Sequence, residues 1–96
     1  MYTANQTNYF LKRAKKLVNK NKKVAKEIDV CIQKLLKDPR DPSLKSHKVI
    51  TPNFDIAYSS RVNGDLRIIW DYSEKQIYVL DLLDIGGHSG STKVYK

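Results

Sequence analysis

The chain has 96 residues, of which 41% are hydrophobic and 29% are charged. These proportions are typical of a globular protein and exclude a disordered chain. A chain of this length forms one domain, residues 1–96, and has no room for a second hydrophobic core. The formal net charge of +8 and the pI of about 9.6 favour a polyanionic partner.

The positive charge is concentrated in the first part of the chain. No acidic residue precedes Glu27, whereas eight lysines and arginines do. Such a segment favours binding to RNA, DNA, an anionic membrane surface or an acidic protein. The alternative is a solvated helix face whose lysines only maintain solubility. The candidate RNA-binding residues of this segment are Lys12, Arg13, Lys15 and Lys16.

The sequence lacks the usual signals of several other classes of protein. Cys31 is the only cysteine, which excludes an internal disulfide, and its apolar neighbours at helical spacing predict a core residue. No segment has the apolar run of a signal peptide or a membrane span, so we expect a cytoplasmic protein with no membrane partner. There is no phosphate-binding loop, dinucleotide fingerprint or metal-ligand spacing, and we therefore expect no cofactor and no metal.

The first half of the chain predicts two helices. Residues 2–6 are compatible with a short edge strand, and Thr7 is a suitable N-cap for a first amphipathic helix. Asn21 lies in a break and is a suitable cap for a second helix. The apolar stripe of that helix contains Val24, Ile28, Cys31, Ile32, Leu35 and Leu36. Pro39 ends the helix, because the residue before a proline avoids the helical region. The short connection predicts an antiparallel helix hairpin.

The second half predicts strands. Asn63-Gly64 lies between two runs of alternating polarity, residues 54–62 and 65–72. This dipeptide favours a two-residue type I′ turn, in which both residues have positive φ. Residues 76–85 are apolar on both faces, as in an interior strand, and we expect Gly86-Gly87 to break that strand. The sequence therefore predicts an α+β domain, with the helix hairpin packed on a twisted antiparallel sheet of three to four strands.

The hairpin also predicts which residues share a face of the sheet. A two-residue loop pairs Ser60 with Arg67 and places the even-numbered residues from Leu66 to Tyr72 on the core face. Arg67 then stands on the opposite, mostly polar face, where it is a candidate anion site. The alternative is a surface ion pair between Arg67 and Asp65 or Asp71. In this register Arg61 projects from the face opposite to Arg67.

Four residues have the chemistry needed to cleave RNA without a metal: His47, Arg67, His88 and Tyr95. Such cleavage requires a base for the 2′-OH proton, an acid for the 5′-oxygen, and a cation for the charge on phosphorus. Histidine performs either proton transfer near neutral pH, and arginine binds phosphate through its planar fork of donors. The alternatives are a backbone-bonded loop histidine at His47, an exposed tail histidine at His88, and a frayed terminus at Tyr95.

The order of these segments resembles the RelE/ParE superfamily of bacterial toxins. The likeness spans residues 10–95, and its most specific parts are D-L-R-I-I-W, I-G-G-H and a closing V-Y. The resemblance implies a RelE-like fold and a ribosome-dependent endoribonuclease that cuts mRNA in the A site by attack of the 2′-OH, leaving a 2′,3′-cyclic phosphate. It also implies a cognate acidic antitoxin, contacts with mRNA and 16S rRNA of the ribosome, and a possible toxin–antitoxin heterotetramer.

The resemblance assigns roles to individual residues. Arg67 matches a phosphate-binding arginine, His47 and His88 match two active-site histidines of the YafQ-type branch, Tyr95 matches a catalytic C-terminal tyrosine, and Asp65 matches an acidic supporting residue. Two lysines of RelE itself are replaced here by Tyr58 and Ser60, which favours the histidine-based version of the mechanism. The further residues assigned to RNA or ribosome binding are Lys48, Arg61 and Lys93.

Two other functions are compatible with the same sequence. A ParE-like toxin inhibits DNA gyrase by binding, without catalysis, and the same fold supports this activity. An inactive remnant or plain RNA-binding module would keep the basic surface and the salt-dependent affinity that phosphate contacts produce. The two histidines and the C-terminal tyrosine that accompany Arg67 favour the nuclease.

Overall fold

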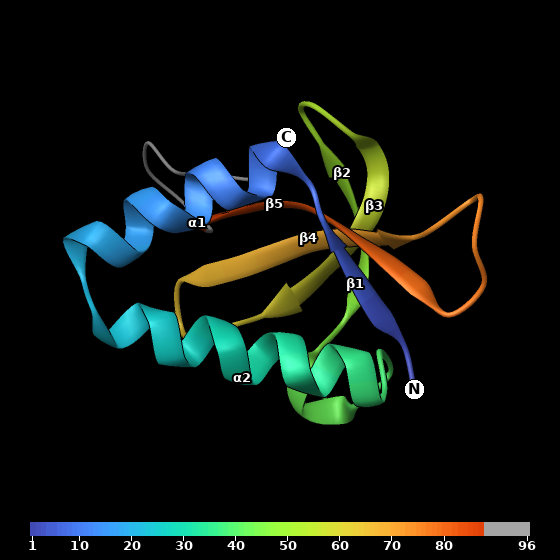
Figure 1. The fold of residues 1–96 in the computed structure, drawn as a ribbon, viewed down its shortest axis with the longest axis horizontal. Coiled ribbons are helices and arrows are strands. Elements are labelled where there is room, and N and C mark those ends of the chain that lie inside the picture. The colour runs from blue at the N-terminus through green and yellow to red at the C-terminus, as the bar shows by residue number, and fades with distance from the viewer. Residues whose placement is uncertain (88–96) are drawn as a thin grey trace.

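The computed structural model describes residues 1–87, which form two helices, one short 3-10 helix and a five-stranded sheet (Figure 1). The elements are β1 (Thr3–Gln6), α1 (Asn8–Lys20), α2 (Lys23–Lys37), η1 (Pro42–Leu44), β2 (His47–Thr51), β3 (Asp55–Arg61), β4 (Leu66–Tyr72) and β5 (Val79–Gly87). The strand order is β1-β5-β4-β3-β2; β1 runs parallel to β5, and all other neighbours are antiparallel. The predicted α+β class is confirmed, but the sheet has five strands rather than three or four.

The helices begin and end where local chemistry predicts. The Thr7 hydroxyl accepts a hydrogen bond from the Phe10 N–H, and the Asn21 side chain accepts one from the Lys23 N–H. These bonds satisfy backbone donors that the first turn of a helix leaves without partners. The second helix ends at Lys37, two residues before Pro39.

Both helices cover the same face of the sheet, as the antiparallel pair in Figure 1 shows. The buried core joins Phe10 of α1 and the apolar stripe of α2 to β4 and β5. Cys31 is among these core residues, as predicted from its spacing. A smaller apolar cluster, formed by Ala57 and Ile69, lies on the other face, which we call the open face.

The strand β5 continues through Gly86 and Gly87, which pair with Arg67 and Leu66 of β4. The prediction that the two glycines break this strand was therefore wrong. A glycine remains in an extended strand without strain and only removes a side chain from the sheet surface. As a consequence, β5 contributes no side chain to the open face at Gly86, in the row of Arg67.

Within residues 1–87, no helix is long and apolar enough to cross a membrane.

Candidate functional site

The β3–β4 hairpin brings Arg61 and Arg67 together. The observed register pairs Arg61 with Arg67 and Ser60 with Ile68, one residue away from the predicted register. The loop therefore contains three residues, Asn63, Gly64 and Asp65, and the type I′ turn is absent: neither Asn63 nor Gly64 has positive φ. Because paired residues of a sheet project to the same side, both arginines stand on the open face. The prediction that they lie on opposite faces was wrong.

The loop backbone holds the two guanidinium groups close to each other. Arg67 donates from Nη1 to the carbonyl oxygens of Asn63, at 2.7 Å, and Leu66, at 3.0 Å. Arg61 donates from Nε to the same Asn63 carbonyl at 3.3 Å. Each bond uses one guanidinium N–H, and a guanidinium carries five. Two cations that share one acceptor form a site with excess positive charge, which a phosphate would neutralise.

Neither the neighbouring strand β5 nor Asp71 provides a side-chain partner for Arg67. Gly86 is its pairing partner on β5 and carries no side chain. Asp71, one of the two acidic partners considered for Arg67, lies four residues along the same strand, about 13 Å away at strand spacing. Its carboxylate accepts the Tyr72 N–H at 2.8 Å. The predicted alternative of an Arg67–Asp71 pair therefore has no geometric support.

His47 stands on the same face as the arginine pair. It is the first residue of β2 and pairs with Ser59, two residues before Arg61, so one strand repeat of about 7 Å separates its row from the arginine row. His47 is exposed, and Nδ1 lies 2.9 Å from the Lys45 carbonyl. Since a carbonyl only accepts, Nδ1 carries the proton in the neutral ring, which leaves Nε2 as a base. The predicted alternative of a backbone-bonded histidine is therefore what the structure shows, with Nε2 not used in this bond.

The structure places the other predicted residues in several locations. Lys12, Lys15 and Lys16 are exposed on α1, and Asp65 is exposed in the hairpin loop. Lys48 projects from the face opposite to the arginine pair, with Nζ 5.9 Å from the Tyr58 ring centroid. His88, Lys93 and Tyr95 lie outside the described residues.

Asp84 is a buried carboxylate on the open face that the sequence analysis did not single out. It pairs with Ile69 on β4 and is 4% exposed. Its Oδ1 accepts the Ile85 N–H at 2.7 Å and lies 3.4 Å from Nε of Arg13. Burial raises the pKa of the Asp84 carboxyl, and the Arg13 charge opposes that increase. An aspartate inside an apolar strand sequence, V-L-D-L-L-D-I, was the signal available for finding it.

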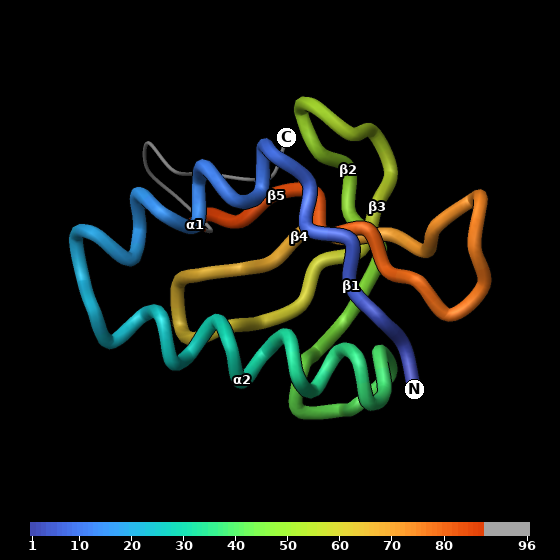
Figure 2. Tube along the Cα trace, in the orientation of Figure 1, coloured from blue at the N-terminus to red at the C-terminus, as the bar shows by residue number. Residues whose placement is uncertain are grey.

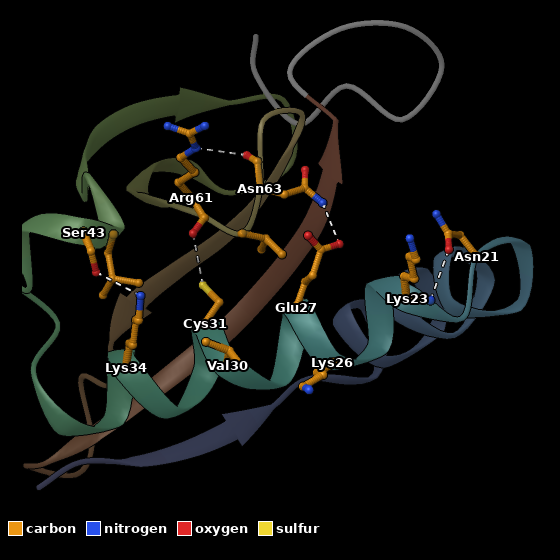
Figure 3. A pocket seen from close by; sticks show the side chains of 12 residues that line it. Asn21, Lys23, Lys26, Glu27, Val30, Cys31, Lys34, Ser43, Arg61 and Asn63 are labelled. Atoms are coloured by element: carbon orange, nitrogen blue, oxygen red, sulfur yellow. Dashed lines mark hydrogen bonds between the residues drawn. The ribbon is translucent and has the colours of Figure 1, made fainter.

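A basic groove lies between α2 and the β3–β4 hairpin, beside the arginine pair (Figure 3). Its volume is about 690 Å³, and its apolar wall includes Val30, Leu44 and Val62. Its charged residues are Lys23, Lys26, Glu27, Lys34 and Arg61. Glu27, the only acidic member, accepts a hydrogen bond from the Asn63 side chain at 3.2 Å. The groove therefore suits a partner that is both acidic and partly apolar.

Cys31 also lines this groove but is not a nucleophile. Its thiol is 3.5 Å from the Arg61 carbonyl, and burial raises its pKa to about 12. The reactive thiolate is therefore scarce at neutral pH. Within the described part of the chain, no group of three or more His, Cys, Asp or Glu residues could hold a metal.

The five-stranded sheet with its helix pair on one face has the fold of several solved structures of bacterial toxins. Its fold is that of the RelE/ParE toxins, as the sequence resemblance implied. It superposes on the YoeB/ParE toxin from Agrobacterium tumefaciens with a TM-score of 0.70 and 12% identity, over 91% of this chain and 99% of that one.

Two further solved structures have the same fold. YafQ from E. coli strain BL21(DE3) has a TM-score of 0.66 and 18% identity, over 91% of this chain and 93% of that one. The conserved hypothetical protein HP0894 from Helicobacter pylori has a TM-score of 0.67 and 22% identity, over 92% and 96%. No family model and no curated protein sequence matches the chain.

Proposed function

We propose that this protein is the toxin of a type II toxin–antitoxin system and that it cleaves mRNA on the ribosome. The observation that carries the proposal is the pairing of Arg61 with Arg67 on an open sheet face that also presents His47. The toxin fold supports the same reading.

The proposed reaction is a metal-free phosphodiester transfer. A base takes the proton of the 2′-OH, the 2′-oxygen forms a bond to phosphorus, and the bond from phosphorus to the 5′-oxygen breaks. An acid gives a proton to the departing 5′-oxygen, and the products are a 2′,3′-cyclic phosphate and a 5′-OH. Arg67 and Arg61 neutralise the charge that develops on the phosphoryl oxygens. The proton-transfer groups come from His47, His88 and Tyr95.

We further propose that a cognate acidic antitoxin occupies the basic groove of Figure 3. The groove presents the cations of α2 beside an apolar wall, which suits an acidic amphipathic segment. Arg61 lies between the two surfaces: its backbone carbonyl faces Cys31 in the groove, whereas its guanidinium points away from α2 and belongs to the arginine pair (Figure 3).

The test is cell-free translation followed by primer extension on the message. Wild-type protein should produce cuts that require ribosomes. Arg67→Ala should reduce their rate by about 10²–10³-fold, the usual effect of removing one donor to a developing negative charge. His88→Ala should reduce the rate by a similar factor, whereas Lys22→Ala, on the exposed loop between the helices, should not.

Two controls make the assay decisive. A thermal unfolding curve for each variant separates loss of the site from loss of the fold, and Arg67→Lys tests whether charge alone suffices. An intact message combined with growth arrest would contradict the nuclease and favour the ParE-like alternative, which a gyrase supercoiling assay would then test.

A further inference from the structure

Five aromatic rings form a continuous path at the end of the molecule where β4 connects to β5. Tyr78 contacts Tyr2 at 5.6 Å between ring centroids, and Tyr2 contacts Tyr72 at 6.1 Å. Tyr72 contacts both Tyr58, at 5.6 Å, and Trp70, at 5.2 Å. Figure 2 shows that this end of the molecule lies opposite the β3–β4 turn that carries the arginine pair.

Part of this path is structural. Trp70 is 1% exposed, stacks on Tyr58 at 4.8 Å and donates from Nε1 to the Ser60 hydroxyl at 2.7 Å. These contacts close the end of the core. The outer rings are different, because Tyr72 is 36% and Tyr78 62% exposed. A core that only needed closing would not require exposed rings.

Two hollows meet at Tyr72. One has a volume of about 360 Å³ and lies between Tyr72, Tyr58 and the loop that carries Arg40 and Lys45. The other has a volume of about 380 Å³ and lies between Tyr72, Tyr2 and Tyr78. Both volumes fall in the range of small-ligand sites. The two hollows are adjacent and share Tyr72 as an aromatic wall.

Three cations surround the first hollow. Arg40 and Lys45 line it, and Lys48 lies over the Tyr58 ring. The one carboxylate lining it, Asp41, accepts hydrogen bonds from the Ser43 N–H at 2.9 Å and the Ser43 hydroxyl at 2.8 Å. The net charge around the first hollow is therefore positive and complements a phosphate backbone. We call the two hollows together the aromatic cleft.

We propose that this aromatic cleft binds single-stranded RNA, with two successive bases against Tyr72 and their phosphates near Arg40 and Lys45. Aromatic faces next to cations are the usual components of sequence-tolerant single-strand binding. The cleft lies at the opposite end of β4 from Arg67, about 17 Å along the strand. It would hold a strand independently of cleavage, so the proposal stands whether or not the protein is a nuclease.

The probe is a fluorescently labelled 2′-O-methyl hexanucleotide, which cannot be cleaved by attack of a 2′-OH, and the readout is fluorescence anisotropy with the full chain. Tyr78→Asn should weaken binding about tenfold, the loss expected for one stacked base. Asparagine suits the left-handed backbone at this position, where φ is 60°. Tyr78→Phe keeps the ring and should bind like wild type.

A charge-matched pair of variants separates the cleft from general attraction to a basic protein. Arg40→Glu with Lys45→Glu should weaken binding at least tenfold more than Lys20→Glu with Lys22→Glu, which changes the net charge equally at the far end of the molecule.

Three results would overturn the proposal. Equal losses for the two charge-reversed variants would show only general electrostatic attraction. An abasic oligomer that binds as tightly as the hexanucleotide would exclude stacking, as would unchanged affinity for Tyr78→Asn. Loss of mRNA cleavage with intact probe binding would affect the proposed nuclease alone, so the two proposals fail separately.

Discussion

Arg61 and Arg67 are two like charges held side by side by one backbone carbonyl. Like charges at adjacent positions of a sheet destabilise the pairing of the strands. In the proposed function, a bound phosphate would remove that repulsion and gain charge-assisted hydrogen bonds. Asp84 differs from this pair, because it is a buried carboxylate that has one cationic neighbour, Arg13, at 3.4 Å.

The buried carboxylate leads to a prediction about pH. The folded pKa of Asp84 is raised above its ordinary value of 3.8, so the folded state binds a proton that the unfolded state has already lost. The contribution of Asp84 to stability is therefore most favourable below the unfolded pKa and is lost as the pH rises through the folded pKa. We expect the wild type to lose stability relative to Asp84→Asn over this range, as measured by urea unfolding at a series of pH values. A pH-independent difference between the two proteins would contradict this prediction.

The β3–β4 hairpin determines which residues form the site. The Asn63 side chain accepts the N–H groups of Asp65 at 2.9 Å and Leu66 at 2.8 Å, which closes a loop of three residues instead of two. Because side chains alternate along a strand, this one-residue change reverses the face of every residue on one strand relative to the other. The loop chemistry, rather than the alternation of the strands, therefore joins Arg61 to Arg67.

The loop conformation predicts that substitutions at Asn63 and Gly64 affect the free energy of unfolding differently. Gly64 does not have positive φ, and a β-carbon there would meet nothing within 4 Å. We expect Gly64→Ala to leave stability unchanged or to raise it by up to about 1 kcal/mol, because alanine restricts the unfolded chain. Asn63→Ala should lower stability by about 1–2 kcal/mol, because it leaves two backbone donors without their acceptor. Urea unfolding measures both, and Asn63→Asp, which keeps the acceptor, is the control. A marked loss for Gly64→Ala would contradict the observed turn.

Across the whole molecule, three surfaces carry separate chemistry. The open face presents the arginine pair, the groove between α2 and the hairpin presents cations around an apolar wall, and the aromatic cleft lies at the far end. The net charge of +8 raises the local concentration of polyanions at all three surfaces. Their separation means that substitutions at one surface can be tested without changing the others.

The groove predicts a specific effect on the antitoxin. Lys26→Glu with Lys34→Glu should weaken binding of the proposed acidic antitoxin by at least about tenfold, because each substitution replaces an attractive charge with a repulsive one. Lys37→Glu with Lys75→Glu changes the net charge equally outside the groove and is the control. Calorimetric titration of the purified proteins measures the affinity, and equal losses for the two pairs would exclude the groove as the binding site.

The sequence by itself determined the helix pair, its caps, the apolar stripe of α2 and the alternating strands. These features depend on residues close together in the chain, through helical and strand periodicity and local capping. It also proposed His47 and Arg67 as candidate site residues from their chemistry. The parallel pairing of β1 with β5, the strand β2, the hairpin register and the burial of Asp84 were decided only by the tertiary structure. Each of these depends on contacts between distant segments or on one hydrogen-bonded loop, and alternation alone does not distinguish a register from its one-residue neighbour.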